Sequence, residues 1–311
     1  MNLSALISTA LCLFILMAIG YLARKRGIIT DESSKGMSTL IIKIGQPALI
    51  IHSFTSTPYS ADLLREAGMI VLLGFALHIF AALYAYLSCR PVRDLDERKL
   101  SEFSLIFANC GFIGFPILES VMGEKGLFWG GFFLVSFFLV HWTWGILILA
   151  RGRTDIRPNV RKIFINSGTV PCAIALGIYL LRIPLPVFVT DAVGYLASLC
   201  TPISMLISGA LLATIPAKQL FGRGQLYLLC LHKLVILPVL VCVVMVLLGM
   251  PVEYTVFTVI MAALPSAAVV TMFAEVYGIK PAFAATAVGL TTLLSVVSLP
   301  CVMWLTERIL S

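Results

Sequence analysis

Two short segments of this sequence combine residue types that bind small solutes with residues that interrupt a helix. The first segment is FANCGFIGFP and the second is ALPSAA. The residues that we expect to bind a substrate there are Asn109, Cys110, Gly111, Gly114, Pro265 and Ser266. Glycine and proline are the weakest helix formers, and both segments lie inside apolar runs where a helix would otherwise continue. Each segment therefore predicts a helix that is broken in its middle.

A broken helix offers groups that can hold an anion. Its second half begins with N–H groups that have no partner inside the helix, at the positive end of the helix dipole. Glycine lets a solute approach the backbone closely, and the side chains of Asn109 and Ser266 add hydrogen bonds. A second hypothesis needs no ligand, because glycine also allows close helix packing in membranes and proline can simply kink a helix. The presence of two interruptions favours the binding hypothesis.

Few ionisable residues lie inside the apolar runs, and most have two interpretations. The carboxyl group of Glu119 either carries a coupling proton or is solvated near a helix end. Lys43 and Lys233 lie about two turns inside their helices, where a lysine either extends to the membrane surface or balances an anionic substrate. The first role is favoured for both. His78 and His141 are expected to be neutral and hydrogen-bonded to a neighbouring helix.

The composition identifies a polytopic membrane protein. Of the 311 residues, 60% are hydrophobic and 12% are charged, and the mean hydropathy is +1.03. No ordinary soluble core buries that much apolar surface. The net charge of +7 comes from Lys and Arg residues scattered through short loops, so we expect no nucleic-acid partner. The eight cysteines form no C-x-x-C pair and no histidine lies at metal-ligand spacing, so we expect no disulfide, metal or cofactor.

Apolar stretches of about 20 residues, the length that crosses the hydrocarbon core, predict an all-α protein with ten transmembrane helices. They cover residues 4–23, 37–55, 67–88, 101–122, 126–150, 164–182, 188–214, 225–249, 253–277 and 282–306. The loops after odd-numbered spans hold 16 Lys and Arg residues, and the other loops and the C-terminal tail hold four. Because positive charge marks cytoplasmic loops, we expect both termini outside and the protein in the inner (plasma) membrane.

An offset of 155 residues aligns the two halves of the chain. It places Gly123, Lys125 and Phe128 on Gly278, Lys280 and Phe283, Pro47 on Pro202 and Ser53 on Ser208. The same offset carries Cys110 onto Pro265, so the two interruptions correspond. Five helices per half is an odd number, which predicts an inverted-topology repeat. The predicted parts are a first five-helix repeat (1–150), a cytoplasmic linker (151–163) and a second, inverted repeat (164–311).

The segment from Asn109 through Pro116, the ten-span layout, the basic central loop and the segment ALPSAA together resemble the auxin efflux carrier family, in particular its short bacterial members. The resemblance implies a fold like those of bile-acid and sodium/proton transporters. In that fold the first, second, sixth and seventh helices form a scaffold, and the other six form a mobile transport domain. It also implies that the fourth and ninth helices cross at the substrate, here at Asn109, Cys110 and Pro265, and that two copies join through their scaffolds.

Members of that family move organic anions, such as auxin in plants and malonate or malate in bacteria. Plant carriers have a proline directly after the crossover asparagine, where this chain has Cys110, which disfavours auxin itself. The leading hypothesis is therefore a secondary transporter of small carboxylates that works by elevator-like alternating access, as a symporter or uniporter. The alternatives are a carrier of an amino acid or other neutral solute, and a membrane sensor that moves nothing. No enzyme is expected, because the spans contain no catalytic cluster.

Overall fold

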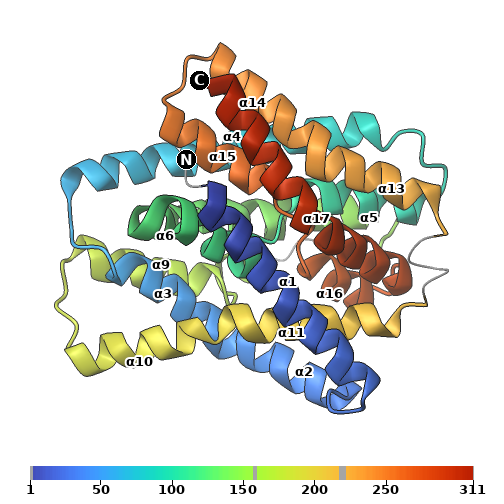
Figure 1. Cartoon of the computed structure of the whole chain (residues 1–311), viewed down its shortest axis with the longest axis horizontal. Coiled ribbons are helices and arrows are strands. Elements are labelled where there is room, and N and C mark those ends of the chain that lie inside the picture. The colour runs from blue at the N-terminus through green and yellow to red at the C-terminus, as the bar shows by residue number, and fades with distance from the viewer. Residues whose placement is uncertain (1–2, 157–159, 217–221, 311) are drawn as a thin grey trace.

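The protein is all-helical in its computed structural model, which describes residues 3–156, 160–216 and 222–310 (Figure 1). The helices of the first half are α1 (Leu3–Lys25), α2 (Asp31–Leu40), α3 (Gln46–Thr55), α4 (Ala61–Ser88), α5 (Leu95–Ile106), α6 (Phe115–Val140) and α7 (Ile146–Ala150). Those of the second half are α8 (Val160–Phe164), α9 (Thr169–Leu180), α10 (Val187–Ser198), α11 (Cys200–Thr214), α13 (Gly224–Leu231), α14 (Leu237–Leu247), α15 (Val252–Ala263), α16 (Val269–Val276) and α17 (Pro281–Leu310). The π-helical turns among the described residues are η1 (Ile41–Gly45), η2 (Cys110–Gly114), η3 (His141–Gly145) and η4 (His232–Ile236).

Seven helical stretches in the described part of the chain are long and apolar enough to cross a membrane. They are Ser4–Lys25, Asp31–Thr55, Ala61–Ser88, Cys110–Ala150, Val187–Thr214, Gly224–Leu247 and Pro281–Leu310. The predicted spans 101–122, 164–182 and 253–277 fall instead on shorter or broken helices. A chain that crosses ten times therefore stays a prediction. Residues 157–159 of the predicted linker lie outside the described residues.

The stretch Cys110–Ala150 doubles back on itself at Gly123. Its 41 residues would make a rod of about 60 Å, twice the thickness of the hydrocarbon core. Gly123 has φ 62° and ψ −148°, a backbone conformation that glycine adopts without the steric cost of a Cβ. A Cβ added to Gly126 would lie 2.5 Å from the carbonyl oxygen of Leu118. In a straight helix these two residues would be about 12 Å apart, so the chain forms a tight hairpin here.

One group of helices packs around a very close crossing of α1 and α11 (Figure 1). A Cβ on Gly20 of α1 would overlap the carbonyl group of Leu206, and a Cβ on Gly209 of α11 would overlap that of Met17. The two backbones therefore touch through glycine on both sides, as is common for helices packed in membranes. Helix α3 packs against α9 and α10 beside this crossing.

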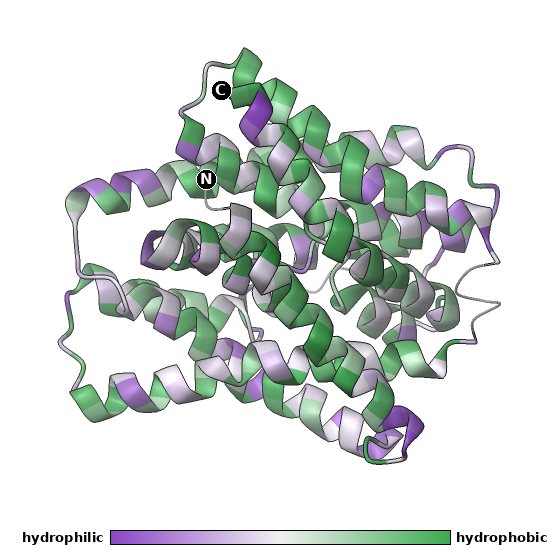
Figure 2. Cartoon of the chain, viewed as in Figure 1, coloured by the Kyte–Doolittle hydropathy of each residue, from purple (hydrophilic) through white to green (hydrophobic). Residues whose placement is uncertain are grey.

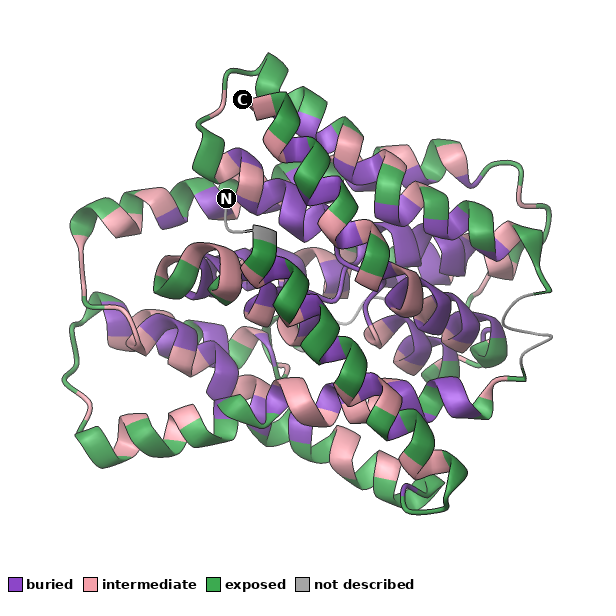
Figure 3. Cartoon of the chain, viewed as in Figure 1, coloured by how far each residue is buried: buried purple, intermediate pink, exposed green. Residues whose placement is uncertain are grey.

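The second group contains α4, α5, α6 and α13 to α17, and it holds most of the buried residues (Figure 3). Eight of the 12 residues of α5 are buried, and so are eight of the 12 residues of α15. Most helices are largely apolar along their length (Figure 2). Many large apolar side chains are exposed, including Leu72 and Ile79 of α4 and Leu247 of α14. A surface of this kind is suited to lipid rather than water.

Candidate functional site

The two helix breaks touch and are hydrogen-bonded to each other. Between α5 and η2, and between α15 and α16, the chain is extended, and Ala108 pairs with Ser266 in an antiparallel β-bridge. The N–H group of Asn109 donates to the carbonyl oxygen of Pro265 (2.8 Å), and the N–H group of Ala267 donates to that of Phe107 (2.9 Å). The structure therefore brings the two predicted segments together as one site, which we call the crossover (residues 107–111 and 264–269).

Local chemistry explains why the chain opens at both places. Proline disfavours the helical conformation of the residue before it, and Leu264, before Pro265, is extended with ψ 148°. Asn109 has φ −77° and ψ 63° and lies at the centre of an inverse γ-turn, in which the N–H group of Cys110 donates to Ala108 O (2.8 Å). The side chain of Asn109 then accepts a hydrogen bond from the N–H group of Phe112 (3.3 Å). Asn109 therefore both turns the chain and caps the next half-helix.

The carbonyl end of α5 finds its partners in the second half of the chain. The last four carbonyl oxygens of a helix accept no hydrogen bond from an N–H group of the same helix. Here Ser104 O accepts a hydrogen bond from the hydroxyl group of Ser266 (3.1 Å), and Leu105 O accepts one from the ammonium group of Lys233 (3.0 Å). The hydroxyl proton that we expected Ser266 to offer to a solute is thus directed to α5. The Ser266 N–H group donates to the hydroxyl oxygen of Thr291 on α17 (3.3 Å).

Four backbone N–H groups at the crossover remain without an acceptor in the part of the chain that the structure describes. They belong to Ala108, Gly111, Ala268 and Val269. Ala108 is buried, as are Asn109, Cys110, Gly114, Pro265 and Ser266, whereas the other three residues are partly exposed. The N–H groups of these three lie at the starts of η2 and α16, where helix dipoles favour negative charge. Of the predicted donors, Gly111 is therefore the one best placed to meet a solute.

A narrow apolar groove runs beside the crossover. Residues from both helix groups line it. They include Met17 of α1, Met205 of α11, Ile113 of η2 and Thr292 of α17. The groove has room for only about one or two water molecules. The groove is lined by residues of η2 and α6 that follow the break and by none of the crossover residues themselves, and it is too small for an organic solute.

The ionisable residues inside the apolar runs differ in how far they are exposed. Glu119 and Lys43 are exposed, and neither forms an ion pair with another described residue. Their roles in coupling or charge balance stay predictions. Lys233, in contrast, is 1% exposed, so the expectation that it extends to the membrane surface is wrong. Sequence reasoning missed its place at the crossover, although the 155-residue offset places it on His78, which lines the same small cavity.

The two buried histidines do not bond to neighbouring helices as expected. His78 Nδ1 lies 2.6 Å from the carbonyl oxygen of Gly74 in its own helix. Neither ring nitrogen of His141 has a hydrogen-bond partner among the described residues. Its ring stacks on Phe273, with the ring centres 4.8 Å apart, and on Phe137. His141 thus serves as an aromatic packing residue between α6 and α16.

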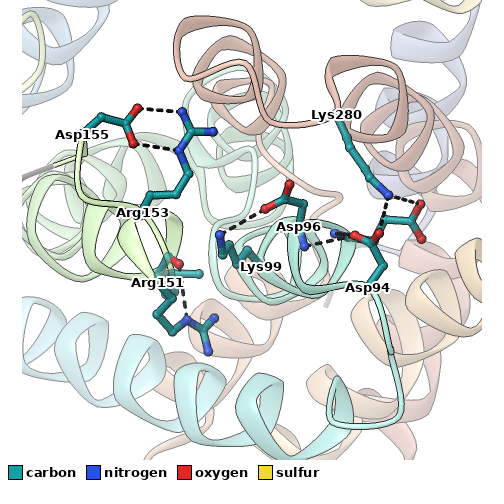
Figure 4. A network of polar contacts seen from close by, with 9 residues as sticks. Asp94, Asp96, Lys99, Arg151, Arg153, Asp155 and Lys280 are labelled. Atoms are coloured by element: carbon teal, nitrogen blue, oxygen red, sulfur yellow. Dashed lines mark hydrogen bonds and ion pairs between the residues drawn. The ribbon is translucent and has the colours of Figure 1, made fainter.

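Two lysines hold the outer ends of the broken helices. Lys280, before α17, contacts Asp94 (2.7 Å) and Glu97 (3.1 Å) at the start of α5 (Figure 4). Lys125, after the hairpin in α6, contacts Glu253 at the start of α15 (2.6 Å). The offset of 155 residues relates the two lysines, so each half of the chain supplies the cation that binds the broken helix of the other half.

The contact between Lys280 and Asp94 also shifts the pKa of both side chains. The hydrogen bond from Lys280 lowers the pKa of Asp94 below its ordinary value of 3.8, and the same bond raises the pKa of Lys280. A carboxyl group with a lowered pKa stabilises the fold fully above its ordinary pKa, and the contribution disappears as the pH falls through the lowered value. The contact therefore persists at neutral pH, although a pair this exposed adds little stability.

Comparison with known proteins places the chain among transporters. The family described as "Membrane transport protein" matches residues 5–170 and 156–303. A Methanothermobacter thermautotrophicus protein named "Uncharacterized transporter" is 25% identical over 298 residues, which cover 94% of this chain and 95% of the relative. A Rhizobium meliloti protein named "Putative malonate transporter" is 24% identical over 300 residues, 94% of this chain and 93% of the relative. A Methanocaldococcus jannaschii protein, also named as an uncharacterized transporter, is 29% identical over 119 residues, which are 38% of each chain.

Proposed function

Because the chain belongs to the membrane transport protein family, which includes the auxin efflux carriers, we propose that it is a secondary transporter of a small carboxylate such as malonate. The observation that carries the proposal is the crossover, where two broken helices are hydrogen-bonded to each other and leave unpartnered N–H groups at the starts of two half-helices. The substrate class is supported by the relative named for malonate. The protein is a multi-pass membrane protein, and we propose the inner membrane as its location.

The proposed architecture is ten membrane crossings in two inverted five-helix repeats. Three observations support it. The positive φ angles of Gly123 and Gly278, 62° and 63°, stand at positions related by the offset. Lys125 and Lys280, related in the same way, each bind the start of the other half's broken helix. The two breaks also lie in corresponding segments of the halves.

The proposed mechanism divides the work between the two helix groups. The crossover and the helices around it carry the anion, and the closely packed pair α1 and α11 belongs to a fixed scaffold that also joins two copies. The anion accepts hydrogen bonds from the N–H groups of Gly111, Ala268 and Val269, and the two helix dipoles favour its charge. Movement of the crossover past the groove walls then exposes the anion alternately on the two sides.

The test is uptake of radiolabelled malonate into proteoliposomes that contain the purified protein. We expect uptake above that of empty liposomes, and a loss of at least about tenfold in Asn109→Ala, because the cap and turn that position η2 are removed. Asn166→Ala is the matched control. Asn166 also caps a helix, with its side chain 2.8 Å from the N–H group of Thr169, but it lies at the start of α9.

The other outcomes separate the competing hypotheses. Equal loss of uptake in both asparagine variants would show a general folding defect and contradict a special role for the crossover. Uptake of a neutral amino acid, with no uptake of malonate or malate, would replace the carboxylate proposal by the neutral-solute carrier. Binding without any flux would identify a sensor.

A further inference from the structure

We propose that Lys233 is a tethered substitute for a bound cation at the crossover, so that this part of the transporter works without sodium. The inference rests on the proposed function only in treating the crossover as the transport site. Its basis is the position of the Lys233 ammonium group at the end of α5.

Lys233 lies where a helix end needs positive charge. It belongs to η4, is 1% exposed, and its Nζ donates to the carbonyl oxygen of Leu105 at 3.0 Å. Leu105 is the second-last residue of α5. The carbonyl groups there carry the negative end of the helix dipole. A monovalent cation bound at the break would take the same position and contact the same oxygen.

No acidic side chain shares this place. In the described residues, no carboxylate lies within the 4.0 Å ion-pair distance of the Lys233 ammonium group. The cavity beside it is lined by apolar side chains together with His78 of α4 and Cys110 of η2. A buried ammonium group without a counter-ion is costly. The carbonyl end of α5 is therefore the negative partner that holds it.

The arrangement exists in only one half of the chain. The 155-residue offset places Lys233 on His78 and Leu105 on Ile260. The carbonyl oxygen of Ile260 accepts the N–H group of Leu264 (3.2 Å), and His78 bonds within its own helix. Phe107 donates in the same way to Phe103 O of α5, so the difference between the two ends lies in the carbonyl groups that follow. At the end of α5, Ser104 O and Leu105 O have side-chain donors from other segments, whereas no side chain of the described residues donates to the last three carbonyl groups of α15. This asymmetry makes Lys233 a positioning residue for the α5 side of the crossover.

The experiment compares Lys233→Ala, Lys233→Arg and the control Lys35→Ala. Lys35 is also a lysine on a helix, α2, but it is exposed. The thermal unfolding midpoint of each purified protein is measured in detergent, in sodium chloride and in choline chloride at equal ionic strength. Malonate flux is measured in the same two salts. The thermal measurements need no substrate, so they remain decisive even if malonate is not transported.

We expect the parent protein to give the same midpoint and the same flux in both salts, and we expect the same of Lys35→Ala. Lys233→Ala should unfold at a lower temperature and lose flux by at least about tenfold, and sodium but not choline should restore part of its midpoint. Lys233→Arg should keep more of the unfolding midpoint and of the flux than Lys233→Ala does, because arginine keeps the positive charge.

Three results would overturn the inference. The first is a parent protein whose midpoint or flux depends on sodium. The second is a Lys233→Ala variant that behaves like Lys35→Ala. The third is a destabilised Lys233→Ala variant that does not respond to sodium, because a lysine needed only for packing would give that result.

Discussion

Gly111 and Gly114 lie three residues apart, yet the structure explains only one of them by packing. A Cβ on Gly114 would lie 2.9 Å from the side chain of Leu264 in the other break, so glycine there permits a close approach. A Cβ on Gly111 would meet nothing within 4 Å, and its φ is not positive. Neither packing nor backbone strain requires glycine at position 111. We propose that glycine at this position gives a solute access to the backbone.

Gly111→Ala should therefore separate function from stability. Alanine favours a helix over glycine by up to about 1 kcal/mol, so the thermal midpoint should stay the same or rise. Malonate flux should fall by at least about tenfold if the methyl group blocks the approach of the anion. Gly177→Ala on α9, also in open space, is the control and should keep its flux. Unchanged flux in Gly111→Ala would remove this residue from the site.

The residue types predicted the crossover better than they predicted its hydrogen bonds. Asparagine, glycine and proline act on their own backbone, so Asn109 and Pro265 identified both breaks from local rules. The partners of Ser266 and Lys233 come from distant segments. A lysine inside an apolar run has the same local pattern whether it extends to the surface, like Lys43, or is buried, like Lys233. Only the packing of η4 against α5 distinguishes them.

At the scale of elements, apolar runs predicted where helices lie but not how closely they approach. The crossing of α1 and α11 depends on glycine positions that look ordinary in the sequence, because glycine is frequent in membrane helices. The hairpin at Gly123 was predicted only as the boundary between two apolar runs. Its geometry depends on a single positive φ angle.

Gly209→Ala tests the contact between α1 and α11. The added methyl group would overlap the backbone of Met17, which cannot move aside as a flexible side chain could. Overpacking of this kind costs about 1–3 kcal/mol, so the thermal unfolding midpoint in detergent should fall. Gly36→Ala on α2, where a Cβ meets nothing within 4 Å, should leave it unchanged. Equal midpoints for the two variants would contradict the close crossing.

At the scale of the whole molecule, the distribution of basic residues predicts which side of the membrane each loop faces. Helix α4 provides a simple test because its 28 residues span about 42 Å, enough for one crossing with some tilt. Asp62 lies at its start and Arg93 follows its end, and both are exposed. The positive-inside rule places Arg93 in the cytoplasm and Asp62 outside.

Labelling of single cysteines in a cysteine-free background checks this orientation. Asp62→Cys should react with a membrane-impermeant maleimide in intact cells. Arg93→Cys should react only after the cells are permeabilised. The reverse pattern would place both termini in the cytoplasm, and labelling of both sites in intact cells would contradict a crossing by α4.

The reciprocal contacts of Lys125 and Lys280 have a consequence for biosynthesis. Translation delivers the first half to the membrane while Glu253, Ser266 and Lys233 are still unsynthesised. At that stage the carbonyl oxygens of Ser104 and Leu105 at the end of α5 lack their side-chain donors, and Lys125 can pair with Glu66 but not with Glu253. The first half therefore cannot complete its hydrogen bonds during its own synthesis. The hydrogen bonds between the two breaks form only after the residues beyond 264 have been made. The two halves therefore depend on each other for folding. In an isolated first half, the last carbonyl groups of α5 would lie in the membrane without their side-chain donors.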